Sequence, residues 1–226
     1  MDYCGTFLTA TAIGTNTASA QSSDRYIGID LIASTPSNIF NGYNTVGAFD
    51  NSDNQSEKHV GIALTYGARD LWDWNGTTIT PEIELAWFND YSTVSASSPG
   101  LPAPTFFYRS NIQTGRLGVN LKAQMDSGAD WRTEFGVGLG AVYREFSTND
   151  TVVQGSTSSF TPYGKIGLRY LKDINTNGRL SIGLNVVVTG NTDIAISSFG
   201  PTPAGNLSVR TVAPEIRIGY QFLLGK

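Results

Sequence analysis

The stretch Trp131-Arg-Thr-Glu-Phe-Gly-Val-Gly-Leu-Gly-Ala-Val-Tyr143 alternates almost strictly between larger apolar residues and residues that are charged or glycine. Side chains alternate across a β-strand, so one face is apolar with an aromatic at each end, and the other carries Arg132, Glu134 and glycines. An apolar band about 25 Å tall with aromatics at its edges is typical of a lipid-facing strand in a membrane barrel. The stretch therefore predicts a membrane-spanning β-strand.

The same two-residue alternation recurs elsewhere along the chain, and no segment has helical periodicity. Together with 131–143, the alternating segments are 26–32, 60–67, 79–87, 116–123, 165–170, 179–188 and 215–222. The fold class that they predict is all-β, an eight-stranded antiparallel up-and-down transmembrane β-barrel.

The connections between these segments alternate in length. Short turns are predicted at 70–76, 126–130 and 173–178, each with Gly, Asn or Asp. Longer polar links are predicted at 34–58, 90–105, 147–159 and 197–208. Short turns at one rim and long loops at the other are typical of membrane barrels.

A soluble barrel with an apolar interior would show the same two-residue alternation. The composition of the polar face must therefore distinguish a membrane barrel from a soluble one. That face is rich in glycine and in Arg paired with Glu, which suits a narrow interior better than a solvated exterior. We therefore predict a charge network inside the barrel, formed by Glu82, Glu84, Arg116, Lys122, Arg132, Glu134, Arg144, Lys165, Arg169, Glu215 and Arg217.

Aromatic residues gather near the ends of the apolar stripes and in the first short turn, as the interfacial belts of a membrane protein require. The predicted interfacial aromatics are Trp72, Trp74, Trp87, Trp131, Tyr143, Tyr170 and Tyr220.

Composition excludes several functions. The 226 residues carry a formal net charge of −4 without a basic patch, which argues against a nucleic-acid partner. One cysteine, Cys4, and one histidine, His59, leave neither a disulfide nor a multi-histidine metal site, and we predict no metal or cofactor. We interpret residues 1–23 as a degraded signal peptide or a disordered extension and 24–226 as the barrel.

The last strand, Arg217-Ile-Gly-Tyr-Gln-Phe-Leu-Leu224, is similar to the C-terminal assembly signal of small Gram-negative outer-membrane β-barrels, with Arg217, Gly219, Phe222 and Leu224 at the matching positions. The chain from residue 24 resembles the group with OmpA-type, OmpX-type and opacity-type barrels. The resemblance implies a place in the outer membrane, contact with lipid and lipopolysaccharide, and recognition by the barrel-assembly machinery. One departure is that Leu223 to Lys226 follow the aromatic on which the family usually ends.

We predict a non-catalytic, monomeric protein that serves membrane integrity, surface interaction or limited small-solute passage. The inner charges are interpreted as a salt-bridged plug, with a narrow pore as the alternative. His59 is interpreted as a solvated histidine at the long-loop rim. Two alternative functions remain: a lipid A-modifying enzyme that uses His59, and a soluble lipocalin-like carrier. The segment 50–54 is interpreted as a polar surface loop. The segment 95–107 is interpreted as a proline-stiffened loop with exposed aromatics.

Overall fold

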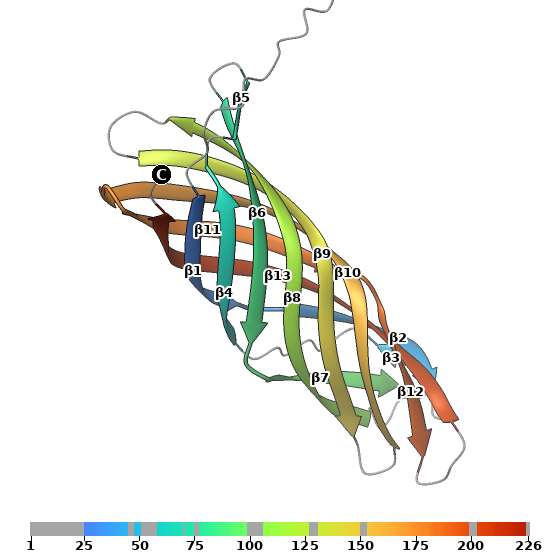
Figure 1. Cartoon of the computed structure of the whole chain (residues 1–226). Coiled ribbons are helices and arrows are strands. Elements are labelled where there is room, and N and C mark those ends of the chain that lie inside the picture. Colours follow the sequence, from blue (N-terminus) through green and yellow to red (C-terminus); the bar gives the residue numbers. More distant parts are fainter. Residues whose placement is uncertain are drawn as a thin grey trace, which may run out of the picture.

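The computed structural model describes residues 25–44, 48–50, 58–69, 71–74, 77–98, 106–126, 131–149, 153–198 and 203–224 (Figure 1). They form one antiparallel sheet of thirteen strands: β1 (Arg25–Ser34), β2 (Ser37–Asn44), β3 (Ala48–Asp50), β4 (His59–Ala68), β5 (Trp72–Trp74), β6 (Thr77–Phe88), β7 (Tyr91–Ser98), β8 (Phe106–Asp126), β9 (Trp131–Asn149), β10 (Val153–Asn175), β11 (Gly178–Thr189), β12 (Thr192–Ser198) and β13 (Pro203–Leu224). Within these ranges no helix is long and apolar enough to span a bilayer. The predicted N-terminal segment, 1–23, lies outside the described residues.

Eight of the strands pair in a closed circuit, which we call the main ring. Its order is β1, β4, β6, β8, β9, β10, β11 and β13, and β13 closes on β1 through pairs such as Tyr220 with Ile29. Each alternating segment of the sequence lies in one of these strands, which confirms the all-β antiparallel prediction. Following paired residues once around from Gly115 returns to Met125, ten residues further along β8. A stagger of this size requires strongly tilted strands, as Figure 1 shows.

The main ring has its apolar face outside. Leu31, Leu139 and Leu184 are each more than 60% exposed, and outward side chains on every strand of the ring are similarly exposed. The inward positions are polar and buried, among them Asp30 and Glu84. The arrangement is therefore the reverse of a soluble cup.

The predicted long polar links are largely β-strand, so the prediction that they are loops was wrong. The link 34–58 contains β2 and β3, 90–105 contains β7, and 147–159 contains the ends of β9 and β10. Most of 197–208 belongs to β12 and β13, and the short turn 70–76 contains β5. The predicted loop 95–107 also begins in β7 and ends in β8. Tyr108, which follows it directly and was expected among the exposed aromatics, is buried.

These additional strands close a second circuit beyond the main ring, which we call the distal ring. Its members are β2, β3, β7, β12 and the adjoining parts of the long strands β8, β9, β10 and β13. In Figure 1 the long strands run without a break from the main ring into this region.

At the border between the rings, the chain leaves one strand and begins the next at three places. The breaks fall at Thr35–Pro36 between β1 and β2, at Asn89–Asp90 between β6 and β7, and at Gly190–Asn191 between β11 and β12. From β1 to β2 the register against β13 is unchanged. From β6 to β7 one extra residue is inserted relative to β8, and from β11 to β12 one extra residue is inserted relative to β13. An inserted residue reverses which side chains face inward. Inward positions accordingly change from even to odd numbers in β7 and from odd to even in β12.

The interior of the distal ring is mainly apolar, and the buried hydroxyl groups among its apolar side chains are those of Thr93, Ser95, Ser110 and Thr148. Its buried cluster consists of Phe40, Tyr91, Tyr108, Ile112, Phe146, Ile194, Ile196, Leu207 and Val209. Outward positions such as Glu145 and Ser147 are polar and exposed. The distal ring therefore has the inside-apolar pattern of a water-soluble β-structure.

Two inward glycines make room for one aromatic ring in the main ring. Gly118 and Gly140 lie opposite each other, and Gly140 also pairs with Tyr163. A Cβ on either glycine would overlap the Tyr163 side chain and the backbone of the neighbouring strand. The absence of side chains at these positions lets the tyrosine ring lie against the wall.

Candidate functional site: the charged lumen

The main ring brings charged residues from seven of its eight strands into its centre, because the inward positions of neighbouring tilted strands meet on the barrel axis. Five carboxylates and seven basic side chains are buried along the lumen or at its border with the distal ring, among the described residues. They are Asp30, Glu82, Glu84, Glu134, Glu215, Arg116, Lys122, Arg144, Lys165, Arg169, Arg179 and Arg217.

Glu84 forms the centre of the network. Its carboxylate accepts hydrogen bonds from Arg217 at 2.7 and 3.0 Å and from the Lys165 amine at 2.7 Å. Arg217 also bonds to Glu215 at 3.0 Å, and Glu215 receives Arg116 at 2.7 Å. These contacts join strands on opposite sides of the lumen.

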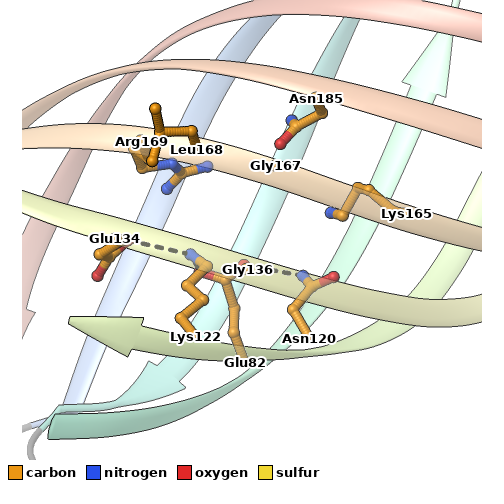
Figure 2. A pocket seen from close by; sticks show the side chains of 10 residues that line it. All are labelled: Glu82, Asn120, Lys122, Glu134, Gly136, Lys165, Gly167, Leu168, Arg169 and Asn185. Atoms are coloured by element: carbon orange, nitrogen blue, oxygen red, sulfur yellow. Dashed lines mark hydrogen bonds and ion pairs between the residues drawn. The ribbon is translucent and has the colours of Figure 1, made fainter. Parts of the chain in front are cut away.

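A second group lies nearer the short-turn rim, around Glu82. The Tyr26 hydroxyl donates to Glu82 at 2.7 Å and the Asn120 amide donates at 3.0 Å. Lys122 also bonds to Glu82 and lies 3.8 Å from Glu134. Figure 2 shows Lys122 between the two carboxylates, with side chains from β10 and β11 directed into the same space.

The cavities left within the network are small. The one in Figure 2 measures about 20 Å³, and a second of about 30 Å³ lies between Arg116 and Arg144. A single water molecule requires about 10 to 15 Å³ on this measure. Each cavity therefore has room for about one or two water molecules.

The structure places most of the predicted network residues together, with two exceptions. Arg132 is one-third exposed and contacts Asp173 at 3.5 Å beside the β10–β11 turn. Arg144 lies at the border with the distal ring, where no carboxylate among the described residues pairs with it. The remaining nine, Glu82, Glu84, Arg116, Lys122, Glu134, Lys165, Arg169, Glu215 and Arg217, are buried in the main ring.

Three members of the network were missed in the predicted set. Asp30 bonds to Arg169 at 2.7 Å, Arg179 bonds to Asp173 at 2.6 Å, and Tyr26 bonds to Glu82. Asp30 and Arg179 lie on the polar faces of alternating segments, so their position in the pattern could have identified them. Tyr26 shares the face of Gly28 and Asp30, so its position also indicated the interior, but it was not included because only charged residues were assigned to the network.

His59 is buried, which contradicts the prediction of a solvated rim histidine. Its ring lies 4.5 Å from the rings of both Phe88 and Tyr91, at the border between the two rings. Ser34 pairs with His59 across β1 and β4 and with Glu215 across β1 and β13. The Ser34 hydroxyl donates to the Pro214 carbonyl at 2.9 Å, and Glu215 is bound by two arginines. These contacts do not link serine, histidine and carboxylate into a proton relay.

A layer of hydroxyl groups separates the charged lumen from the apolar cluster. Tyr91 and Thr211 both donate to the Asn38 side-chain oxygen, at 3.1 and 2.7 Å. Burial raises the pKa of Tyr91, so its hydroxyl stays protonated as this bond requires. Arg144 bonds to Thr189 and Thr192 in the same layer, both at 2.9 Å.

The predicted interfacial aromatics lie at two levels of the outer surface. Trp72, Trp131, Tyr170 and Tyr220 lie toward the short-turn rim, whereas Trp87 and Tyr143 lie near the border with the distal ring. Between the levels the outward residues are aliphatic or Phe135. The side chain of Trp74 and the segment 51–57 lie outside the described residues.

The C-terminal segment supplies the closing strand. Phe222 and Leu224 point outward and pair with Ile27 and Arg25 on β1. Arg217 points into the lumen, and Gly219 lies beside Asp30.

Neither the protein-family models nor the curated proteins contain a match to this sequence. Solved structures do match. OprG of Pseudomonas aeruginosa, an outer-membrane protein, is 11% identical with a TM-score of 0.56, covering 92% of this chain and 98% of OprG. A major outer-membrane protein of Thermus thermophilus is 11% identical with a TM-score of 0.55, covering 88% and 99%.

The outer-membrane protease OmpT of Escherichia coli is 7% identical with a TM-score of 0.54, covering 88% of this chain and 97% of OmpT. Sequence identities as low as these establish the fold alone. The chain has the β-barrel fold of small Gram-negative outer-membrane proteins, in agreement with the resemblance found in the sequence.

Proposed function

We propose that the protein is a non-catalytic, eight-stranded up-and-down transmembrane β-barrel of the outer membrane, with a closed lumen and a distal ring exposed at the cell surface. The main support is the reversal of side-chain polarity. Outward residues are apolar in the main ring and polar in the distal ring, as lipid around one and water around the other would require.

The closed lumen is supported by the two cavities of about 20 and 30 Å³. Neither holds a continuous column of water, and the ion pairs around Glu84 cross the axis. The network therefore acts as a salt-bridged plug rather than a pore, leaving membrane integrity or contact with a surface partner as the protein's role. The polar exterior of the distal ring is the surface that such a partner would meet.

The proposal extends to biogenesis and lipid contact. The positions of Arg217, Gly219, Phe222 and Leu224 in the closing strand suit recognition by the barrel-assembly machinery. The two aromatic levels suit the interfaces of a bilayer whose outer leaflet is lipopolysaccharide. A barrel closed upon itself needs no partner strand, which suits a monomer.

The first test asks whether the protein folds as a membrane barrel. Folded outer-membrane barrels resist SDS until they are heated, so the unheated protein should migrate differently from the boiled protein on SDS gels. Identical mobility would count against the proposal.

The second test is ion conduction in planar bilayers at high salt. The wild-type protein should produce no channel steps. The double variant Glu84→Ala with Arg217→Ala should admit water and conduct, because it removes both sides of the central pair. Arg132→Ala, at the exposed rim, is the matched control and should remain silent. Channels from the wild-type protein would refute a closed lumen.

The fold also accommodates enzymes, since OmpT is a protease. We favour a non-catalytic role because Ser34 and Glu215 are each bonded to other groups, and the buried Nε2 atom of His59 has no hydrogen-bond partner. Acyl release from lipopolysaccharide should therefore stay at background for the wild-type protein and for His59→Ala. Release by the wild-type protein that His59→Ala abolishes would establish the enzymatic alternative.

A further inference from the structure

Arg144 differs from the other buried basic residues of the lumen. Arg116, Lys122, Lys165, Arg169, Arg179 and Arg217 each contact at least one carboxylate. Arg144 is 1% exposed, and its partners among the described residues are the hydroxyls of Thr189, Thr192 and Thr211 and the carbonyl of Val209. These neutral groups satisfy its terminal nitrogens but leave its positive charge without a counterion.

Arg144 lines a cavity whose other lining residues also carry unpartnered nitrogen atoms. The cavity measures about 30 Å³ and is also lined by Arg116, Thr114 and His59. The Nε atoms of both arginines, one terminal nitrogen of Arg116 and the Nε2 atom of His59 are buried without a hydrogen-bond partner. Thr114 lies directly opposite Arg144 in the pairing of β8 with β9.

One carboxylate also lines the cavity, and its charge is already compensated. Glu215 is bound by Arg116 at 2.7 Å and by Arg217 at 3.0 Å. The excess charge at the cavity is therefore positive and belongs to Arg144. An isolated buried charge is costly unless a counterion accompanies it.

We propose that this cavity binds a small monatomic anion such as chloride. Such an ion would accept hydrogen bonds from the free Nε groups and neutralise Arg144. The volume is sufficient for one particle slightly larger than water and favours a single-atom anion over phosphate. The bound ion would stabilise the border where the charged lumen meets the apolar distal ring.

The test is the thermal unfolding of the full chain in detergent micelles, with sodium chloride replaced by sodium gluconate at constant ionic strength. The unfolding midpoint of the wild-type protein should rise by several degrees with chloride and then saturate, as for any ligand of the folded state. Arg144→Gln should lose this dependence. Arg179→Gln, equally buried but at the opposite end of the lumen, should retain it.

A second variant keeps the test decisive if Arg144→Gln does not fold. Thr114→Leu fills the cavity and leaves all charges unchanged, so it should also lose the chloride dependence. In crystals soaked in bromide, the anomalous signal should lie beside Arg144 in the wild-type protein. Equal midpoints of the wild-type protein in chloride and gluconate, or the same rise in Thr114→Leu, would overturn the proposal.

Discussion

The two halves of β9 bury opposite kinds of side chain within one continuous strand. From Trp131 to Tyr143 its outward residues are apolar except Thr133, and its inward residues include Glu134 and glycines. Beyond Tyr143, Glu145 and Ser147 face outward while Phe146 is buried in an apolar cluster. The backbone is the same throughout, so the surroundings decide which face is polar. Lipid around the main ring and water around the distal ring would account for the change.

The difference also changes what holds each ring together. The main ring cannot gain from burying its outward apolar residues against protein, so its interior is joined by ion pairs such as those of Glu84. The distal ring is stabilised by apolar burial, as in a soluble domain. Substitutions should therefore have different effects in the two regions.

The largest expected effect is loss of the central carboxylate. Glu84→Gln leaves Lys165 and Arg217 buried with less compensation, which should lower the free energy of unfolding by about 3 to 5 kcal/mol. The measurement is urea unfolding of the protein in lipid vesicles, followed by tryptophan fluorescence. Arg132→Gln removes a partly exposed pair and should cost less than about 1 kcal/mol. Similar losses in both variants would contradict a stabilising role for the buried ion pairs.

Removing an aromatic from the distal cluster should have the next largest effect. Phe146 is 0% exposed, so Phe146→Ala leaves a cavity and should cost about 3 kcal/mol. Phe135 is 48% exposed on the outer surface of the same strand, where lipid can fill the space. Phe135→Ala should therefore cost clearly less in the same urea titration. Equal costs would mean that the two regions do not differ in how they bury apolar groups.

An arginine introduced on the outer face of β9 tests where the lipid-covered part of the strand ends. Leu139→Arg places a guanidinium within the apolar band of β9 and should cost about 2 kcal/mol. Ser147→Arg faces outward on the same strand beyond Tyr143 and should be nearly neutral. Refolding yields and urea midpoints in vesicles would compare them. A neutral Leu139→Arg would place water around the main ring and refute the membrane assignment.

The smallest expected effect concerns the inward glycines. A Cβ at Gly140 would overlap the backbone of β8 and the Tyr163 ring, so Gly140→Ala should cost about 1 to 2 kcal/mol. A Cβ at Gly136 would have Lys122 Cγ as its nearest neighbour, at 3.5 Å, so Gly136→Ala should be tolerated. Unfolding midpoints of the two variants would show whether the inward glycines are needed for the room that they leave. Equal midpoints would contradict that role.

The alternation within 131–143 and its seven counterparts was sufficient to predict the eight strands of the main ring. A period of two fixes which residues share a face, and glycines beside Arg and Glu on the polar face indicated which face is inside. The same reasoning failed beyond the border. There the polar face turns outward, and one-residue insertions at Asn89–Asp90 and Gly190–Asn191 reverse the phase. Strands such as β7 therefore resembled polar loops.

The sequence by itself determined the strands that alternate strongly, the apolar outer face and most of the inner charges, because these follow from local periodicity and composition. Only the tertiary structure decided which charges meet, that His59 is buried, and that Arg144 has no carboxylate paired with it among the described residues. Those facts depend on the stagger of ten residues around the ring, which joins side chains from strands far apart in the chain. No local pattern contains that information, since it arises only when β13 closes on β1.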